Sequence, residues 1–199
     1  MNVRIAQLLS INAGAWYDGA LEMNQYTIKL WMITQTFDPA EQNIAFLRAK
    51  HFVYNELENT IFINSEDSKC ADFSVAGLNI TTLPGDPVDQ LIGIMLFHKL
   101  NAVMEGRIGI VEVEISASDA VIYLHSENET SEDIVQPSWW SVADLTHCDF
   151  ATTNSEKVLS IPQSTSWREL GLAWPDQPTE TETGNIVVFA DFKSSDDTK

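Results

Sequence analysis

The stretch from Pro84 to His125 constrains the fold more than any other part of this 199-residue chain. Its pattern predicts a turn, a helix, a glycine stop and two alternating strands. The helix is apolar on nearly every side, because residues 90–105 contain few polar side chains, namely Gln90, His98, Lys99, Asn101 and Glu105. A helix of this kind must be covered all round. We therefore expect it to lie at the centre of a folded domain.

Two Asp-Pro pairs, Asp38-Pro39 and Asp86-Pro87, predict where helices begin. Each pair offers a capping carboxylate followed by a proline suited to a first helical turn. Aligning the pairs, 48 residues apart, also places the strand-like residues 60–63 on residues 108–111. Convergence of unrelated helix starts is the alternative explanation of this match.

The alternating segments 26–34 and 78–83 precede these two helices. Strand, helix and strand therefore follow one another twice. We predict an α+β fold of two tandem strand-helix-strand units, of the ferredoxin-like or split βαβ type, with two helices on one face of a sheet.

The chain changes character after residue 126. Residues 127–133 are acidic, and residues 185–192 alternate like a last strand. Four of the six tryptophans lie between these segments, namely Trp139, Trp140, Trp167 and Trp174. We predict a core domain, 1–126, and an irregular C-terminal extension, 127–199, packed on the core or on a partner. The tryptophans either cover the sheet or anchor an interface, where Trp is enriched.

Charge limits the possible partners. The 29 acidic residues against 11 Lys and Arg give a net charge of -18, which repels nucleic acid and anionic membranes. We expect no direct nucleic-acid or membrane binding, although an acidic surface could imitate DNA toward a basic protein.

Cys70 and Cys148 are unclustered, and neither a signal peptide nor an apolar run of about 18 residues is evident. These features favour a soluble, cytoplasmic protein.

No catalytic, cofactor-binding or metal-binding motif is recognisable in the sequence. His98, inside the apolar helix, is expected to be structural, and Arg48 and His51 are expected on a solvated helix face. The adjacent residues 147–149 (His-Cys-Asp) do not by themselves suggest a metal site. His125 ends a strand, where sites do occur. The candidate interaction residues are therefore Trp139, Trp140, Trp167, Trp174 and His125.

The segments 38–63 and 80–107, the latter reading ITTLPGDPVDQLIGIMLFHKLNAVMEGR, resemble small uncharacterised proteins of tailed marine phages, particularly those of cyanobacteria. The resemblance extends over about residues 25–125 and lies in general pattern rather than in a catalytic motif. It implies no activity. It implies a viral context, with the protein in the host cytoplasm or in the virion.

Three functional hypotheses follow. The first is a non-enzymatic structural or protein-interaction module, self-associating through a sheet edge or through the Trp-bearing region. The second is an acidic inhibitor that imitates nucleic acid toward a basic host protein. The third is an enzyme using acidic residues around His125.

Overall fold

The computed structural model describes residues 4–118, 121–129, 134–145 and 166–175. These residues form an α+β structure with one six-stranded sheet. The elements are β1 (Arg4–Tyr17), β2 (Ala20–Thr34), α1 (Pro39–His51), β3 (Ile61–Asn64), α2 (Lys69–Val75), β4 (Ile80–Leu83), α3 (Asp89–Met104), β5 (Ile108–Ser116) and β6 (Ile122–Ser126). A π-helical turn, Phe52–Glu56, extends α1, and a 3-10 turn, Ser138–Ser141, follows β6.

The long β1–β2 hairpin is the frame of the sheet. Its two-residue turn is Asp18-Gly19, and both residues have positive φ, 49° and 77°, as a tight hairpin turn requires. The strand order is β4-β3-β1-β2-β5-β6. The pairs β1–β2, β2–β5 and β5–β6 are antiparallel, whereas β1–β3 and β3–β4 are parallel.

The sheet does not clearly consist of two tandem ferredoxin-like units. The expected order of elements occurs twice, as β2–α1–β3 and as β4–α3–β5. However, β1 lies between β2 and β3, and β2 and β3 run in opposite directions because β1 is antiparallel to one and parallel to the other. Three strands separate β4 from β5. The hairpin at the start of the chain occupies the centre of the sheet and keeps the strands of each unit apart.

The two helix starts also differ from each other. Asp38 caps α1 as predicted, because its Oδ1 accepts a hydrogen bond from the Ala40 amide at 2.8 Å. In contrast, α3 begins at Asp89 with Val88 as its N-cap. Asp86 lies in the preceding loop and accepts from the Asn64 side chain at 3.2 Å. The 48-residue match therefore does not extend to the capping geometry.

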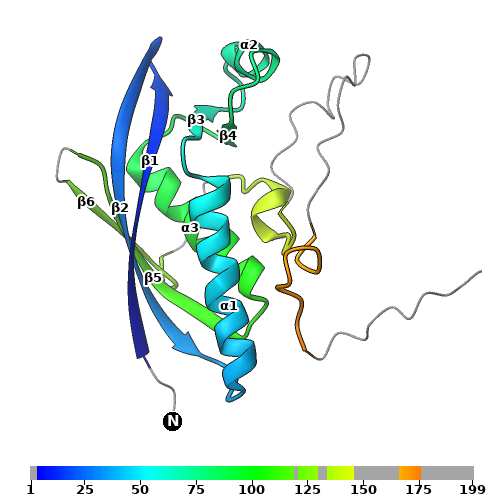
Figure 1. Cartoon of the computed structure of the whole chain (residues 1–199). Coiled ribbons are helices and arrows are strands. Elements are labelled where there is room, and N and C mark those ends of the chain that lie inside the picture. The colour runs from blue at the N-terminus through cyan, green and yellow to red at the C-terminus, as the bar shows by residue number, and fades with distance from the viewer. Residues whose placement is uncertain (1–3, 119–120, 130–133, 146–165, 176–199) are drawn as a thin grey trace, which may run out of the picture.

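The prediction that α3 is central is confirmed. Ten of its sixteen residues are buried, and it packs against α1, β5, β6 and the turn at 138–141. Figure 1 shows α1 and α3 on the same side of the sheet. The helix ends where predicted, with Glu105 and Gly106 in the left-handed region at φ 46° and 73°, a common way to end a helix.

Gly93 allows α3 to lie close to the sheet, and this contact generates a stability prediction. A Cβ on Gly93 would lie 3.2 Å from Ile115 Cγ2 and 3.2 Å from the Tyr123 ring. Gly93→Val should therefore lower the free energy of unfolding by about 1–3 kcal/mol, measured by urea titration. Ala102→Val, at a half-buried position of the same helix, is the control. An equal effect of both variants would contradict the close contact.

Candidate functional site

A buried arginine attaches the segment 166–175 to the helices. Arg48 on α1 is 1% exposed. Its Nε donates to the Leu172 carbonyl at 2.8 Å, and its Nη1 donates to Glu105 Oε1 at 2.6 Å and to the Val103 carbonyl at 3.3 Å. Burial lowers the pKa of Arg48, and the hydrogen bond that Arg48 donates to Glu105 opposes that change. The expectation that Arg48 lies on a solvated face was wrong.

Two tryptophans of the same segment lie against this guanidinium. The Arg48 Cζ is 3.9 Å from the Trp174 ring centroid and 4.9 Å from that of Trp167. Arg107 lies 4.4 Å from the Trp174 centroid and forms an ion pair with Glu41 at 3.6 Å. Trp174 is thus held by two cations, an arrangement in which desolvation strengthens the cation–π attraction.

A buried lysine attaches the segment 134–145 in a similar way. Lys99 on α3 is fully buried, and its Nζ donates to the carbonyls of Trp139, Val142 and Asp144 at 3.1, 2.8 and 2.7 Å. Burial lowers the pKa of Lys99 to about 8, while the charges of Asp144 and Glu56 act in the opposite direction. The three carbonyls use all three donors of the ammonium group. Lys99 therefore acts as a structural clamp.

The structure buries the side chains of the four candidate tryptophans. Their exposed fractions are 5% for Trp139, 1% for Trp140, 7% for Trp167 and 2% for Trp174. They belong to the same buried cluster as the core of α3. In the described residues they therefore cover the core, and their rings are not exposed for a partner. The predicted last strand, 185–192, lies outside the described residues.

The fifth candidate, His125, belongs to a buried aromatic cluster. It is 3% exposed, and its Nδ1 lies 3.3 Å from Glu129 Oε2. Its ring centroid is 6.3 Å from that of His98, which stacks on Trp140 at 6.1 Å. His98 Nε2 also lies 2.9 Å from Gln136 Nε2. The structure thus brings two of the candidate residues, His125 and Trp140, into contact with the same ring, that of His98.

This cluster has the surroundings of neutral histidines. Burial lowers the pKa of both His98 and His125. The positive charge of His125 adds to the effect at His98, while Glu129 opposes it at His125. Among the described residues, no three His, Cys, Asp or Glu side chains are placed to hold a metal ion. Residues 147–149 lie outside that part of the chain.

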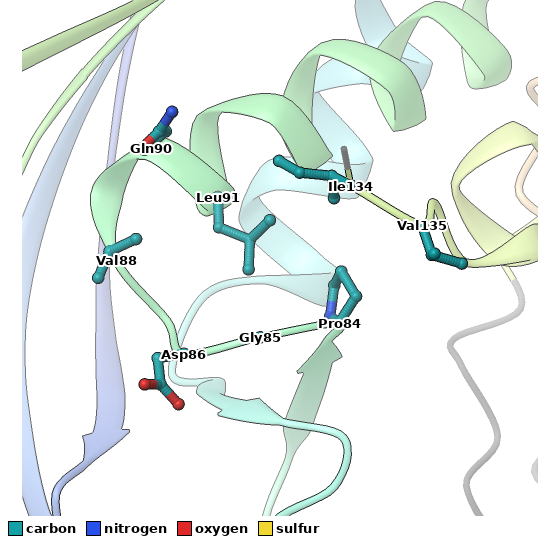
Figure 2. A pocket seen from close by; sticks show the side chains of 8 residues that line it. All are labelled: Pro84, Gly85, Asp86, Val88, Gln90, Leu91, Ile134 and Val135. Atoms are coloured by element: carbon teal, nitrogen blue, oxygen red, sulfur yellow. The ribbon is translucent and has the colours of Figure 1, made fainter. Parts of the chain in front are cut away.

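A pocket of about 430 Å³ opens beside the start of α3 (Figure 2). Its lining residues come from the β4–α3 loop, the first turn of α3 and the segment 134–145, namely Pro84, Gly85, Asp86, Val88, Gln90, Leu91, Ile134 and Val135. The lining is mainly apolar, with Asp86 as its one carboxylate. A single carboxylate without a basic or nucleophilic neighbour does not make an acid–base pair.

The face of the sheet turned away from α1 and α3 is uncovered in the described residues (Figure 1), and we call it the open face. Directly opposed residues of an antiparallel sheet share a face. Leu8, Lys29, Glu114 and Leu124 therefore form one row across β1, β2, β5 and β6. Leu8 and Leu124, at the two ends of this row, are 68% and 41% exposed.

The middle of this row is neutralised internally. Lys29 Nζ lies 2.9 Å from Glu114 Oε1 and 4.4 Å from the Trp31 ring centroid. Trp31 Nε1 donates to Glu114 Oε1 at 2.8 Å. The hydrogen bonds from Trp31 and then Lys29 lower the pKa of Glu114. The open face therefore carries exposed leucines around a paired charge.

Comparison with known proteins gives limited information. No family model and no curated protein matches the chain. An uncharacterised protein from Wolinella succinogenes has a TM-score of 0.49 at 12% identity, over 64% of this chain and 99% of the other. The 6-pyruvoyl tetrahydropterin synthase of Plasmodium vivax has a TM-score of 0.46 at 14% identity, over 65% of this chain and 99% of the other. That of Caenorhabditis elegans has a TM-score of 0.40 at 13% identity, over 64% of this chain and 97% of the other. Similarity at this level assigns no activity.

No helix in the described part of the chain is long and apolar enough to cross a membrane.

The Lys99 clamp can be tested by Lys99→Met, which keeps the length of the side chain but leaves the carbonyls of Trp139, Val142 and Asp144 without their donor. The free energy of unfolding should fall by about 2–4 kcal/mol, measured by urea titration with tryptophan fluorescence. Lys50→Met, at an exposed position of α1, should have little effect. A Lys99→Met variant as stable as the wild type would contradict the clamp.

The lowered pKa values of His98 and His125 predict a pH dependence of stability. Burial holds their pKa values in the folded state below the ordinary histidine value of 6.5, so below pH 6.5 the unfolded chain binds more protons than the folded one. The contribution of these two histidines to the free energy of unfolding should therefore be fully present above pH 6.5 and should decrease as the pH falls below that value. Urea titrations of the wild type and of His98→Gln, at pH 7 and pH 5, check this. The variant should lose less stability between these pH values, and an equal loss would contradict the assignment to His98.

Proposed function

We propose that this chain is a non-enzymatic structural or protein-interaction module that associates with further copies of itself through its sheet. The observation that supports this most is the open face, which ends at an exposed edge strand. Leu8 is 68% exposed, Ile122 66% and Leu124 41%. Exposed apolar side chains that share one uncovered face favour a binding surface over a purely solvated one.

The roles of the buried polar residues also support a structural module. Arg48 and Lys99 are engaged by backbone carbonyls and by aromatic rings of the same chain. His98 and His125 lie among aromatic rings, where burial lowers the pKa of both imidazoles. In the described residues, these four side chains are parts of the packing between the core and the segments that follow β6.

Imitation of nucleic acid remains the alternative proposal, based on the net charge of -18. Several carboxylates, however, bind groups of the same chain on separate elements. Glu58 accepts from Asn12, Asp67 accepts from Trp16, and Glu105 pairs with Arg48. A mimic needs its carboxylates free and in register with phosphates, so these three contacts count against mimicry. The viral context and the host cytoplasm stay predictions from the resemblance.

Salt dependence separates the two proposals. Two copies that each carry a charge of -18 repel one another, and salt screens this repulsion. Sedimentation equilibrium between 20 and about 500 mM salt should therefore show self-association that strengthens with salt, at a mass above 22.3 kDa. Binding of an acidic mimic to a basic protein weakens with salt. A monomer at every salt and protein concentration would contradict our proposal.

A further inference from the structure

We infer that β6 is the pairing edge, and that it forms an antiparallel ladder with β6 of a second copy, centred on Leu124. This inference rests on the proposed self-association and specifies its surface. Among the residues that the structure describes, β6 is an outer strand and pairs with β5 alone. Its sequence, Ile122–Ser126 (IYLHS), contains no proline, lysine, arginine or carboxylate. Natural edge strands usually carry such residues, which prevent pairing with other chains.

The opposite edge of the sheet is protected. β4 has only four residues, Ile80–Leu83, and Pro84, which has no amide proton to donate, follows directly. α2 packs beside this strand. The two edges are therefore not equivalent, and a head-to-tail chain of copies through β4 and β6 is disfavoured. An open edge on one side alone fits a closed pair related by a twofold axis.

The register of β6 shows which backbone groups face outward. His125 is opposite Val113, and the Glu127 amide donates to the Val111 carbonyl at 3.0 Å. In an antiparallel ladder the bonded residues alternate. Residues 123, 125 and 127 therefore turn their backbone groups toward β5, while Ile122 and Leu124 turn theirs to the free edge.

This register suits a symmetric pair. With Leu124 opposite Leu124 of the second copy, each would donate its amide to the carbonyl of the other. The Leu124 side chains, 41% exposed in one chain, would then meet on the open face. Ile122, 66% exposed, would lie opposite Ser126 of the second copy.

The electrostatics at this edge also permit two acidic copies to meet. β6 has no formally charged residue while His125 is neutral, and burial lowers the pKa of His125. Glu114, which is opposite Leu124 on β5, is paired with Lys29 at 2.9 Å. Glu112 of β5 is opposite Ser126, and Glu127 directly follows β6. Charge is therefore absent or paired at the centre of the ladder, around Leu124, where the two copies would meet.

The main test compares two leucines with the same exposed fraction. Leu124 on β6 and Leu47 on α1 are both 41% exposed. Leu124→Glu should weaken self-association at least tenfold in sedimentation equilibrium, whereas Leu47→Glu should change it less than twofold. Leu124→Pro removes the outward amide and should weaken it similarly, with circular dichroism and urea midpoints checking that each variant folds.

A crosslinking test does not depend on loss of binding. Opposed bonded residues of an antiparallel ladder have Cα atoms about 5.5 Å apart, within the range of a disulfide. Leu124→Cys should form a disulfide-linked dimer under mild oxidation, and Leu47→Cys should not.

The outcomes separate this inference from the proposed function. If the wild type self-associates but Leu124→Glu and Leu124→Pro associate equally well, the β6 inference is overturned and the proposed function stands. If Leu8→Glu, on β1 of the open face, abolishes association while both Leu124 variants retain it, the contact lies on the face and not at the edge. A wild type that stays monomeric overturns both.

Discussion

Burial of α3 on every side is the constraint on which the rest of the structure depends. The sheet covers one side so closely that a Cβ added to Gly93 would lie 3.2 Å from Ile115 Cγ2. Helix α1 covers another side. The segment 134–145 covers the side that carries His98 and Lys99. Without it, apolar surface and a lysine on an otherwise apolar helix would face water. The described parts of the C-terminal extension therefore complete the core, rather than forming an appendage to it.

Local sequence signals predicted local structure well. The Asp38 cap, the stop at Gly106, the strand β5 and its hairpin partner β6 all follow from residues close together in the chain. The same signals failed at Asp86, whose side chain binds Asn64 of another element. These local signals also do not predict the order of the strands in the sheet. The position of β1 between β2 and β3 depends on pairings between residues that are far apart in sequence.

The clamps show why candidate sites were harder to predict. Helical periodicity placed Arg48 on a polar face, but its acceptor at Leu172 is 124 residues away. Lys99 bonds carbonyls 40 to 45 residues further along the chain. One signal was present in the sequence, because a single lysine within an apolar helix must find buried acceptors or escape to solvent. The abundance of tryptophan indicated packing, but it did not indicate that the partners were cations of the same chain.

The distribution of charge links this packing to association. Of the 11 basic residues, Lys29, Arg48, Lys99 and Arg107 are committed to contacts within the chain. The outer surface therefore has few cations left to offset 29 carboxylates. Two copies can approach only where charge is absent or already paired, since repulsion between exposed like charges extends over about a Debye length. The centre of β6, around Leu124 and beside the Lys29–Glu114 pair, meets that condition, so the acidity of the chain restricts where association can occur rather than preventing it.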